Sequence, residues 1–123
     1  MRPYDQVPGL GSVYFEDSFV LGIEEAPDCL SFELDLVLRE SHALYRPPGP
    51  DQQYCYRRAR LDFPRLRRVC WNRREIKPTL DASGSKDYGN IDAFTEHPDG
   101  VFHLEGDWGA VTVESSHPTI TVK

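Results

Sequence analysis

The strongest constraint on the fold of this chain is the segment 29–38, in which every second side chain is apolar. The apolar positions of this alternation are Leu30, Phe32, Leu34, Leu36 and Leu38. Alternation with a period of two places all of them on one face of an extended strand, because successive side chains of a strand point to opposite sides. The segment therefore predicts a β-strand with one buried face and one mostly polar face.

The residues before this strand predict its partner in a β-hairpin. Phe19, Leu21 and Ile23 alternate in the same way, and Ala26–Pro27 lies within a polar turn sequence. A two-residue loop at Ala26–Pro27 pairs Ile23 with Leu30 and puts all three upstream apolar residues on the buried face.

Asp17 is the exception in this hairpin. The same register points it inward opposite Leu36, where a lone carboxylate is costly unless it is paired or hydrogen-bonded. Either Asp17 is functional or the register breaks, and a β-bulge at residues 16–18 that turns the side chain outward is the explanation we favour.

The last third of the sequence predicts a four-stranded meander with turns at 97–100, 107–108 and 115–118. This register pairs Leu104 with Val111 and Val113 with Ile120. The expected core face is Ile91, Ala93, Thr95, Phe102, Leu104, Val111, Val113, Ile120 and Val122. Phe94, His103 and Glu105 then lie on the opposite face.

A third hairpin fits residues 54–63 and 67–74, with its turn at 64–66 and Leu61 opposite Val69. Its outer face presents aromatic and basic side chains, namely Tyr54, Tyr56, Arg58, Arg60, Arg68 and Arg74. About eight short strands, without any helical periodicity, predict an all-β fold, either a β-sandwich or a partly open barrel. The length of 123 residues favours a single β domain over residues 1–123.

Composition indicates the cellular compartment in which this chain folds. Cys29, Cys55 and Cys70 are odd in number and widely spaced, which argues against a disulfide framework or a structural zinc site. No segment is long and apolar enough to span a membrane, and the start of the chain lacks a signal core. We therefore expect a cytoplasmic protein that has no cofactor and makes no membrane contact.

Charge is strongly segregated along the chain. The net charge is −6, yet the basic segment 57–77 holds eight arginines and Lys77 against Asp62 and Glu75, a local charge of +7. Arginines interleaved with tyrosines suit single-stranded nucleic acid or a nucleotide. A nucleic-acid binder is usually basic overall, however, so we favour pairing of this segment with acidic strands of the same fold or of a second copy.

Asp92, His103 and Glu105 form the most suggestive group for chemistry. The predicted meander puts them on one face, where two carboxylates and an imidazole suit a divalent metal or acid–base catalysis of a small-ligand reaction. An ordinary solvated sheet face explains the same residues, and this is the interpretation we favour. Nucleophile elbows, phosphate-binding glycine loops and paired metal-binding histidines are missing from the sequence.

Trp108 is expected at a hairpin tip between glycines. A tryptophan at a tip either folds back on the sheet or anchors a partner. With Phe94 and Glu105 it predicts a protein-contact surface that is acidic and partly aromatic. The leading expectation is thus a noncatalytic domain that binds a partner protein, as an inhibitor or immunity-type protein does, or that forms a homodimer. Nucleic-acid or nucleotide binding is the second possibility, and a metal-assisted enzyme or small-ligand binder is the third.

Overall fold

The computed structural model describes residues 1–75, 79–80 and 86–123. Its elements in chain order are β1 (Arg2–Pro3), the 3₁₀-helix η1 (Tyr4–Gln6), β2 (Val13–Ala26), β3 (Cys29–Leu38), β4 (Cys55–Pro64), β5 (Arg68–Arg74), β6 (Thr79–Leu80), β7 (Lys86–Asp87), β8 (Ala93–His97), β9 (Val101–Gly106), β10 (Gly109–Glu114) and β11 (Thr119–Val122). None of the helical residues in these ranges forms a helix long and apolar enough to cross a membrane.

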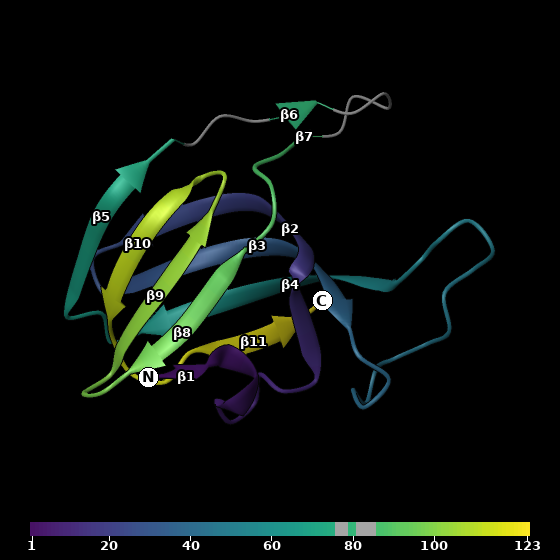
Figure 1. The fold of residues 1–123 in the computed structure, drawn as a ribbon, viewed down its shortest axis with the longest axis horizontal. Coiled ribbons are helices and arrows are strands. Elements are labelled where there is room, and N and C mark those ends of the chain that lie inside the picture. Colours follow the sequence, from purple (N-terminus) through teal and green to yellow (C-terminus); the bar gives the residue numbers. More distant parts are fainter. Residues whose placement is uncertain (76–78, 81–85) are drawn as a thin grey trace.

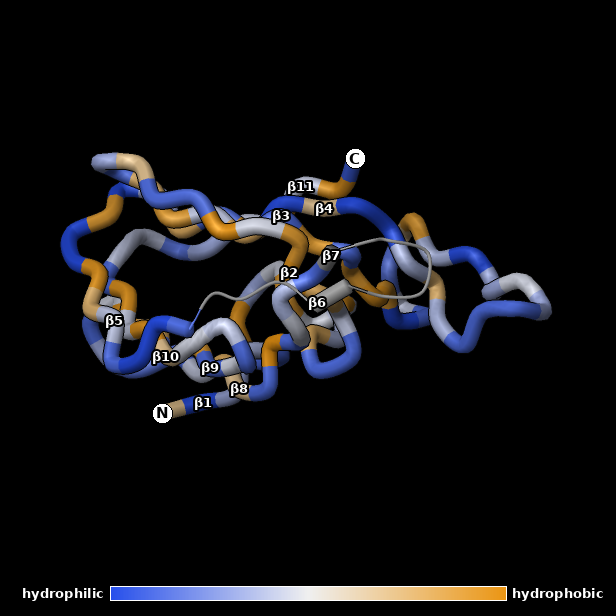
Figure 2. The backbone as a smooth tube through the Cα atoms, turned by 90° about the horizontal axis from the view of Figure 1, so that it is seen from above, coloured by the Kyte–Doolittle hydropathy of each residue, from blue (hydrophilic) through white to orange (hydrophobic). Residues whose placement is uncertain are grey.

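Two antiparallel sheets make up the fold, as the sequence predicted (Figure 1). One sheet has the order β1-β8-β9-β10-β5, the other has the order β11-β4-β3-β2, and β6 pairs with β7. Viewed from above, the four-stranded sheet lies over the five-stranded sheet in two layers (Figure 2). In the described residues the two sheets stay separate, so the architecture is consistent with a sandwich and not with a closed barrel.

The core lies between these layers. All five apolar side chains of the alternating run 30–38 are buried, which confirms the predicted inner face of β3. Phe63 of β4 joins the two sheets, because its ring contacts Phe32 in its own sheet at a centroid distance of 6.2 Å. The same ring contacts Phe94 at 5.8 Å and Phe102 at 5.6 Å across the interface.

The first hairpin forms, but its register differs from the prediction. Its turn lies at Pro27–Asp28, so Ile23 pairs with Phe32 instead of Leu30. Two register shifts follow along β2, and the one between Val20 and Gly22 buries Val20 while Phe19 and Leu21 stay partly exposed. Strict alternation cannot continue through a bulge, and for this reason the predicted inward placement of Phe19 and Leu21 is wrong.

The C-terminal meander has three strands. The β9–β10 hairpin has the predicted register, with Leu104 opposite Val111 and Phe102 opposite Val113. Strand β8 is displaced by one residue, because His97 pairs with Val101 across a three-residue turn. Since a one-residue displacement turns a strand over, Phe94 faces the core and the predicted outer position of Phe94 is wrong.

Two predicted strand pairings are also wrong. Strands β4 and β5 lie in different sheets, and β11 pairs with β4, placing Ile120 opposite Leu61 instead of Val113. Apolar alternation gives β4, β5 and β11 a buried face without specifying a neighbour. β4 also pairs with β3, which sets Glu33 opposite Arg60, and this contact between opposite charges favours the β3–β4 pairing.

Candidate functional site

Trp108 and Phe94 lie in the core and not on the expected contact surface. Trp108 is fully buried, donates its indole N–H to the Asn90 carbonyl at 3.0 Å, and packs edge-on against Phe32 and Trp71. Phe94 is 3% exposed. Of the three protein-contact residues expected from the sequence, only Glu105 remains at the surface.

Glu105 belongs to a polar network on the outer face of the five-stranded sheet. His103 lies 2.8 Å from the Glu105 carboxylate through Nε2 and 3.3 Å from the Thr112 hydroxyl through Nδ1. Asn72 donates to the same hydroxyl at 3.2 Å. An open hollow of about 500 Å³ lies beside the network, and its lining includes His97, His103, Glu105 and Thr112.

Asp92 does not complete a metal site there. Its backbone N–H donates to the Glu105 carbonyl at 2.8 Å. Burial, followed by the Asp107 and Glu105 carboxylates, raises the pKa of Asp92, as expected where negative charges repel. Over residues 1–75, 79–80 and 86–123, no group of three or more His, Cys, Asp or Glu side chains is arranged to hold a metal ion.

The predicted basic surface is divided between the two sheets. Arg58 and Arg60 lie with Tyr54 and Tyr56 at the four-stranded sheet, whereas Arg68 belongs to β5. The proposed single surface of tyrosines and arginines therefore exists only in part, because it rested on a β4–β5 hairpin that does not form.

Two arginines of β4 lie beside carboxylates of their own fold. Arg60 contacts Asp62 at 2.8 Å and Glu33 at 3.8 Å, and Arg58 lies opposite Asp35 on β3. Burial tends to raise the pKa of Asp62, but hydrogen bonds from Ser31 and Arg60 outweigh burial and lower it. The interpretation that the basic segment pairs with acidic strands of the same chain thus holds for β4.

Beside these charges lies a row of four partly exposed aromatic rings, which we call the aromatic row: Tyr14, Tyr54, Tyr56 and Phe19. Adjacent centroids are 6.4 Å apart for Tyr14 and Tyr54, 6.2 Å for Tyr54 and Tyr56, and 6.1 Å for Tyr56 and Phe19. Two rings come from β2, and Tyr56 comes from β4 with Tyr54 just before that strand.

The register of β2 explains why sequence reasoning found only half of this row. Phe19 was expected inside, and it reaches the row because β2 shifts register between Val20 and Gly22. A second shift, between Tyr14 and Phe19, spans residues 16–18, where we favoured a bulge for Asp17. The carboxylate at position 17 thus signalled an irregular strand, but the prediction placed the irregularity only at residues 16–18.

Two phenols of the row have a raised pKa. A hydrogen bond to the Asp17 carboxylate, helped by burial, raises the pKa of Tyr54. Burial, then the charges of Asp17 and Asp35, raises the pKa of Tyr56. Both phenols therefore remain protonated over a wide pH range and act as hydrogen-bond donors.

A surface hollow of about 380 Å³ continues the row at the Tyr14 end. It is lined by Tyr14, Val37, Leu38, Arg39, Glu40, Tyr45, Gln53, Tyr54 and Cys55. The Arg39 guanidinium lies 5.0 Å from the centroid of Tyr14, held there by its hydrogen bond to the Val13 carbonyl. Aromatic rings, phenol donors and one fixed cation are groups that bind side chains or planar ligands.

Comparisons of this chain with protein-family models, with curated proteins and with solved structures gave no match.

Proposed function

We propose that this chain is a noncatalytic domain that binds a partner protein through the aromatic row. The supporting observation is the row itself, in which four rings stay partly exposed on a sheet face bordered by paired charges. Tyrosine and arginine are enriched at the centres of protein interfaces, where a large rigid ring loses little entropy on binding. An inhibitor or immunity-type role in a reducing compartment such as the cytoplasm fits this proposal, since all three cysteines are free.

The experiment removes the central rings and leaves the sheet intact. Tyr54→Ala with Tyr56→Ala is compared with His97→Ala plus His103→Ala, which removes two rings from the outer face of the other sheet. Each tagged protein is used to capture partners from cells that produce it, after urea unfolding has shown that both variants are folded.

We expect the native chain and the histidine variant to capture the same partner. The amount captured by the tyrosine variant should be at least about tenfold lower, as expected for central interface residues. Equal capture by all three proteins would overturn the proposal.

Nucleic-acid binding is the second candidate, because Tyr54, Tyr56, Arg58 and Arg60 do share the four-stranded sheet. It predicts affinity for single-stranded oligonucleotides that falls steeply with salt and is lost on replacing Arg58. The pairing of Arg60 with Asp62 and Glu33 makes this candidate weaker, since those contacts occupy the guanidinium. Titration of the chain with a labelled oligonucleotide at two salt concentrations separates the candidates.

A further inference from the structure

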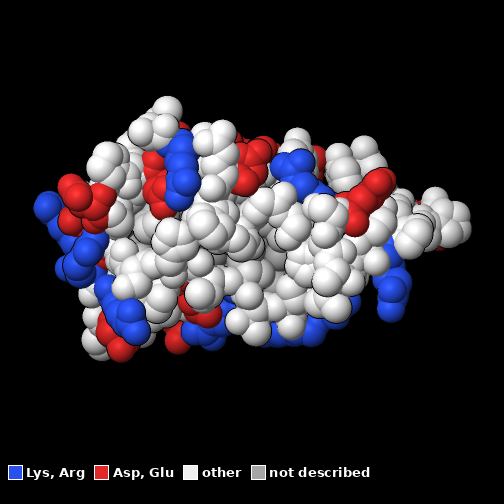
Figure 3. All heavy atoms as spheres, turned by 90° about the horizontal axis from the view of Figure 1, so that it is seen from below, with Lys and Arg blue, Asp and Glu red and all other residues white. Residues whose placement is uncertain are grey.

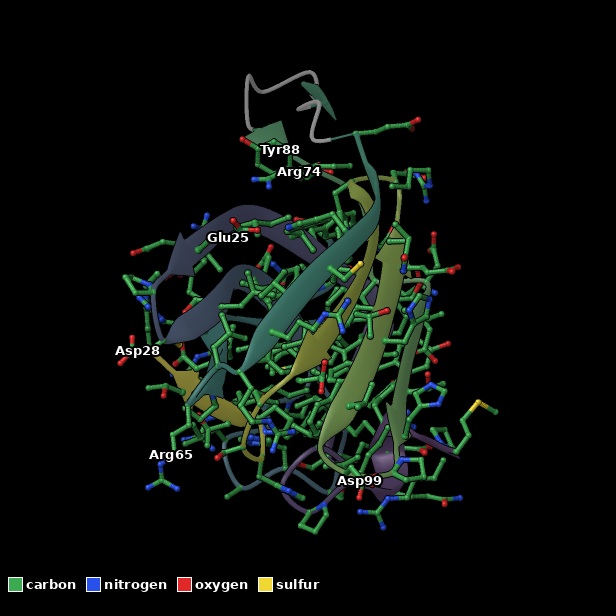
Figure 4. All side chains as sticks on the ribbon, turned by 90° about the vertical axis from the view of Figure 1, so that its left-hand side faces the viewer. Glu25, Asp28, Arg65, Arg74, Tyr88 and Asp99 are labelled. Atoms are coloured by element: carbon green, nitrogen blue, oxygen red, sulfur yellow. The ribbon has the colours of Figure 1, made fainter. Side chains whose placement is uncertain are left out.

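Strand β5 has an open edge. It is the last strand of the five-stranded sheet and pairs with β10 alone among the residues that the structure describes. In an antiparallel pair only alternate residues direct N–H and C=O groups at the partner. Six residues of β5 pair with β10, with Asn72 as a bulge between Trp71 and Arg73, and they leave the groups of about three residues directed outward. Figure 4 looks onto this edge, with β5 in front of the sheets.

The other long edge of the sandwich is partly covered. Val20 of β2 exchanges backbone hydrogen bonds with residues 88–89, which precede β8. Tyr88 donates to the Val20 carbonyl and Val20 donates to the Gly89 carbonyl, both at 2.8 Å. The remaining edge strands, β1 and β11, are two and four residues long. β5 is thus the described strand best able to accept a further strand.

Arginines lie at both ends of this open edge, namely Arg65, Arg67, Arg68, Arg73 and Arg74. Arg65 precedes the strand, and Arg74 ends it beside Glu25 (Figure 4). The side chains of Arg68, Arg73 and Arg74 are 71%, 43% and 50% exposed. Their ion pairs with Glu114, Glu75 and Glu25 span 3.3 to 3.9 Å at the surface, where such pairs contribute little free energy.

The charges decide which strand can be added. In an antiparallel pair of two copies of β5, Arg68 of one copy lies near Arg73 and Arg74 of the other, and like charges opposite each other destabilise a sheet. A second copy of this chain is therefore disfavoured at this edge. Seen from below, acidic and basic side chains lie together at the end of the molecule at which β5 lies in Figure 1, and the middle of that face is largely uncharged (Figure 3).

We propose that the edge of β5 binds an extended acidic segment of another protein by strand addition. Carboxylates near the two ends of the added segment pair with Arg68 and with Arg73 and Arg74, while main-chain hydrogen bonds hold its middle. The net charge of −6 does not prevent this, because charges beyond about 8 Å are largely screened at physiological salt.

The side chains on the two faces of β5 predict which positions of the bound segment are apolar. Val69 and Trp71 point toward the core, pack against it and remain partly exposed at this corner of the sandwich. Cys70 lies on the other face of the strand and is exposed. A bound segment should carry apolar side chains on the Val69 side, alternating with polar ones on the Cys70 side.

The test uses an acetylated and amidated seven-residue peptide with Glu at both ends and alternating Val and Thr between them. A second peptide has the same side chains but carries N-methyl groups on the amides that would donate to β5, and a third has Lys in place of Glu. Binding is measured by calorimetry, and the contacted amides are located by ¹⁵N NMR.

We expect the first peptide to bind and to shift the amides of β5, with at least about tenfold weaker binding of each other peptide. Arg68→Ala plus Arg74→Ala should weaken the first peptide by a similar factor. The matched variant Arg57→Ala plus Arg58→Ala on β4 should leave it unchanged.

Equal binding of the N-methylated peptide would show ion pairing without strand addition, and no binding would show that the arginines only guard the edge. Either result overturns the proposal. The Tyr54→Ala plus Tyr56→Ala variant should bind the first peptide normally, so failure of the aromatic row and failure of this edge are distinguishable.

Discussion

Trp108 owes its position to the glycines around it. A Cβ atom at Gly106 would lie 2.3 Å from the indole nitrogen of Trp108 and 2.2 Å from the Asn90 carbonyl oxygen. Gly109 has a φ of +145° and passes against the backbone of Arg73. Only residues without a side chain leave room for the ring to fold from the hairpin tip into the core.

Replacement of Trp108 should test this arrangement. Trp108→Ala removes a fully buried ring and should lower the free energy of unfolding by about 3–5 kcal/mol. Trp108→Phe keeps most of the packing but leaves the Asn90 carbonyl without its donor, which should cost about 1–3 kcal/mol. Urea unfolding followed by circular dichroism measures both, and a Trp108→Phe variant as stable as the native chain would contradict the role of the indole N–H.

Asp62 should make the free energy of unfolding depend on pH in the acid range, as measured by urea unfolding at a series of pH values. Its pKa is lower in the folded chain than in the unfolded chain, so its contribution is complete above the unfolded value of about 4 and is lost as pH falls through the lowered value. Asp62→Asn should therefore destabilise the chain at pH 7, and the difference from the native chain should close toward pH 2.

Asp35 is the matched control for this measurement, because it lies on the neighbouring strand and its pKa moves the other way. Burial raises that pKa despite the nearby Arg58, so ionisation of Asp35 disfavours folding as pH rises through the raised value. Asp35→Asn should leave stability at pH 7 unchanged or increased. Destabilisation at pH 7 by Asp35→Asn equal to that by Asp62→Asn would contradict the assignment.

At the level of elements, alternation predicted strands well and their partners poorly. The inner face of β3 and the β9–β10 register follow from side-chain periodicity and a tight turn, which act over a few residues. Displacement of β8 depended on whether its turn holds two or three residues, and Gly100, at a φ of +73° after Asp99 at +67°, is the third. The aromatic row was missed in part because a bulge in β2 moves Phe19 to the surface.

The unexpected pairing of β11 with β4 can be tested by cross-linking. Thr121 lies opposite Arg60, whereas the four-stranded meander would have placed it opposite Thr112. Arg60→Cys with Thr121→Cys should form a disulfide under mild oxidation, since directly opposed strand residues lie within bridging distance. Thr112→Cys with Thr121→Cys is the control, and preferential bridging of that pair, located by peptide mapping, would contradict the β11–β4 pairing.

Across the whole molecule, the two sheets exchange strands between the halves of the chain. β5 follows β4 directly yet completes the sheet of β8, β9 and β10, while β11 follows β10 yet completes the sheet of β2, β3 and β4. Neither half therefore contains all strands of its own sheet. We expect the single domain predicted from the sequence to unfold as one cooperative unit.

Fragments provide the test at this scale. Residues 1–75 and 76–123, produced separately, should each lack cooperative thermal unfolding, and an equimolar mixture should recover it because the first fragment supplies β5 and the second supplies β11. A cooperative transition in either fragment alone would contradict this expectation. The mixture should also restore the near-ultraviolet signal of buried Trp108, which contacts Phe32 of the other fragment.

The position of β11 has a consequence for synthesis on the ribosome. Strands β2, β3 and β4 leave the ribosome early, but the edge of β4 stays without its neighbour until residues 119–122 have been translated and have left the ribosome. Throughout that interval the nascent chain exposes the edge of β4 at residues 59–62, where it can pair with other chains. Arg57, Arg58 and Arg60 on β4 would then protect the growing polypeptide from aggregation, a task that ends when β11 docks.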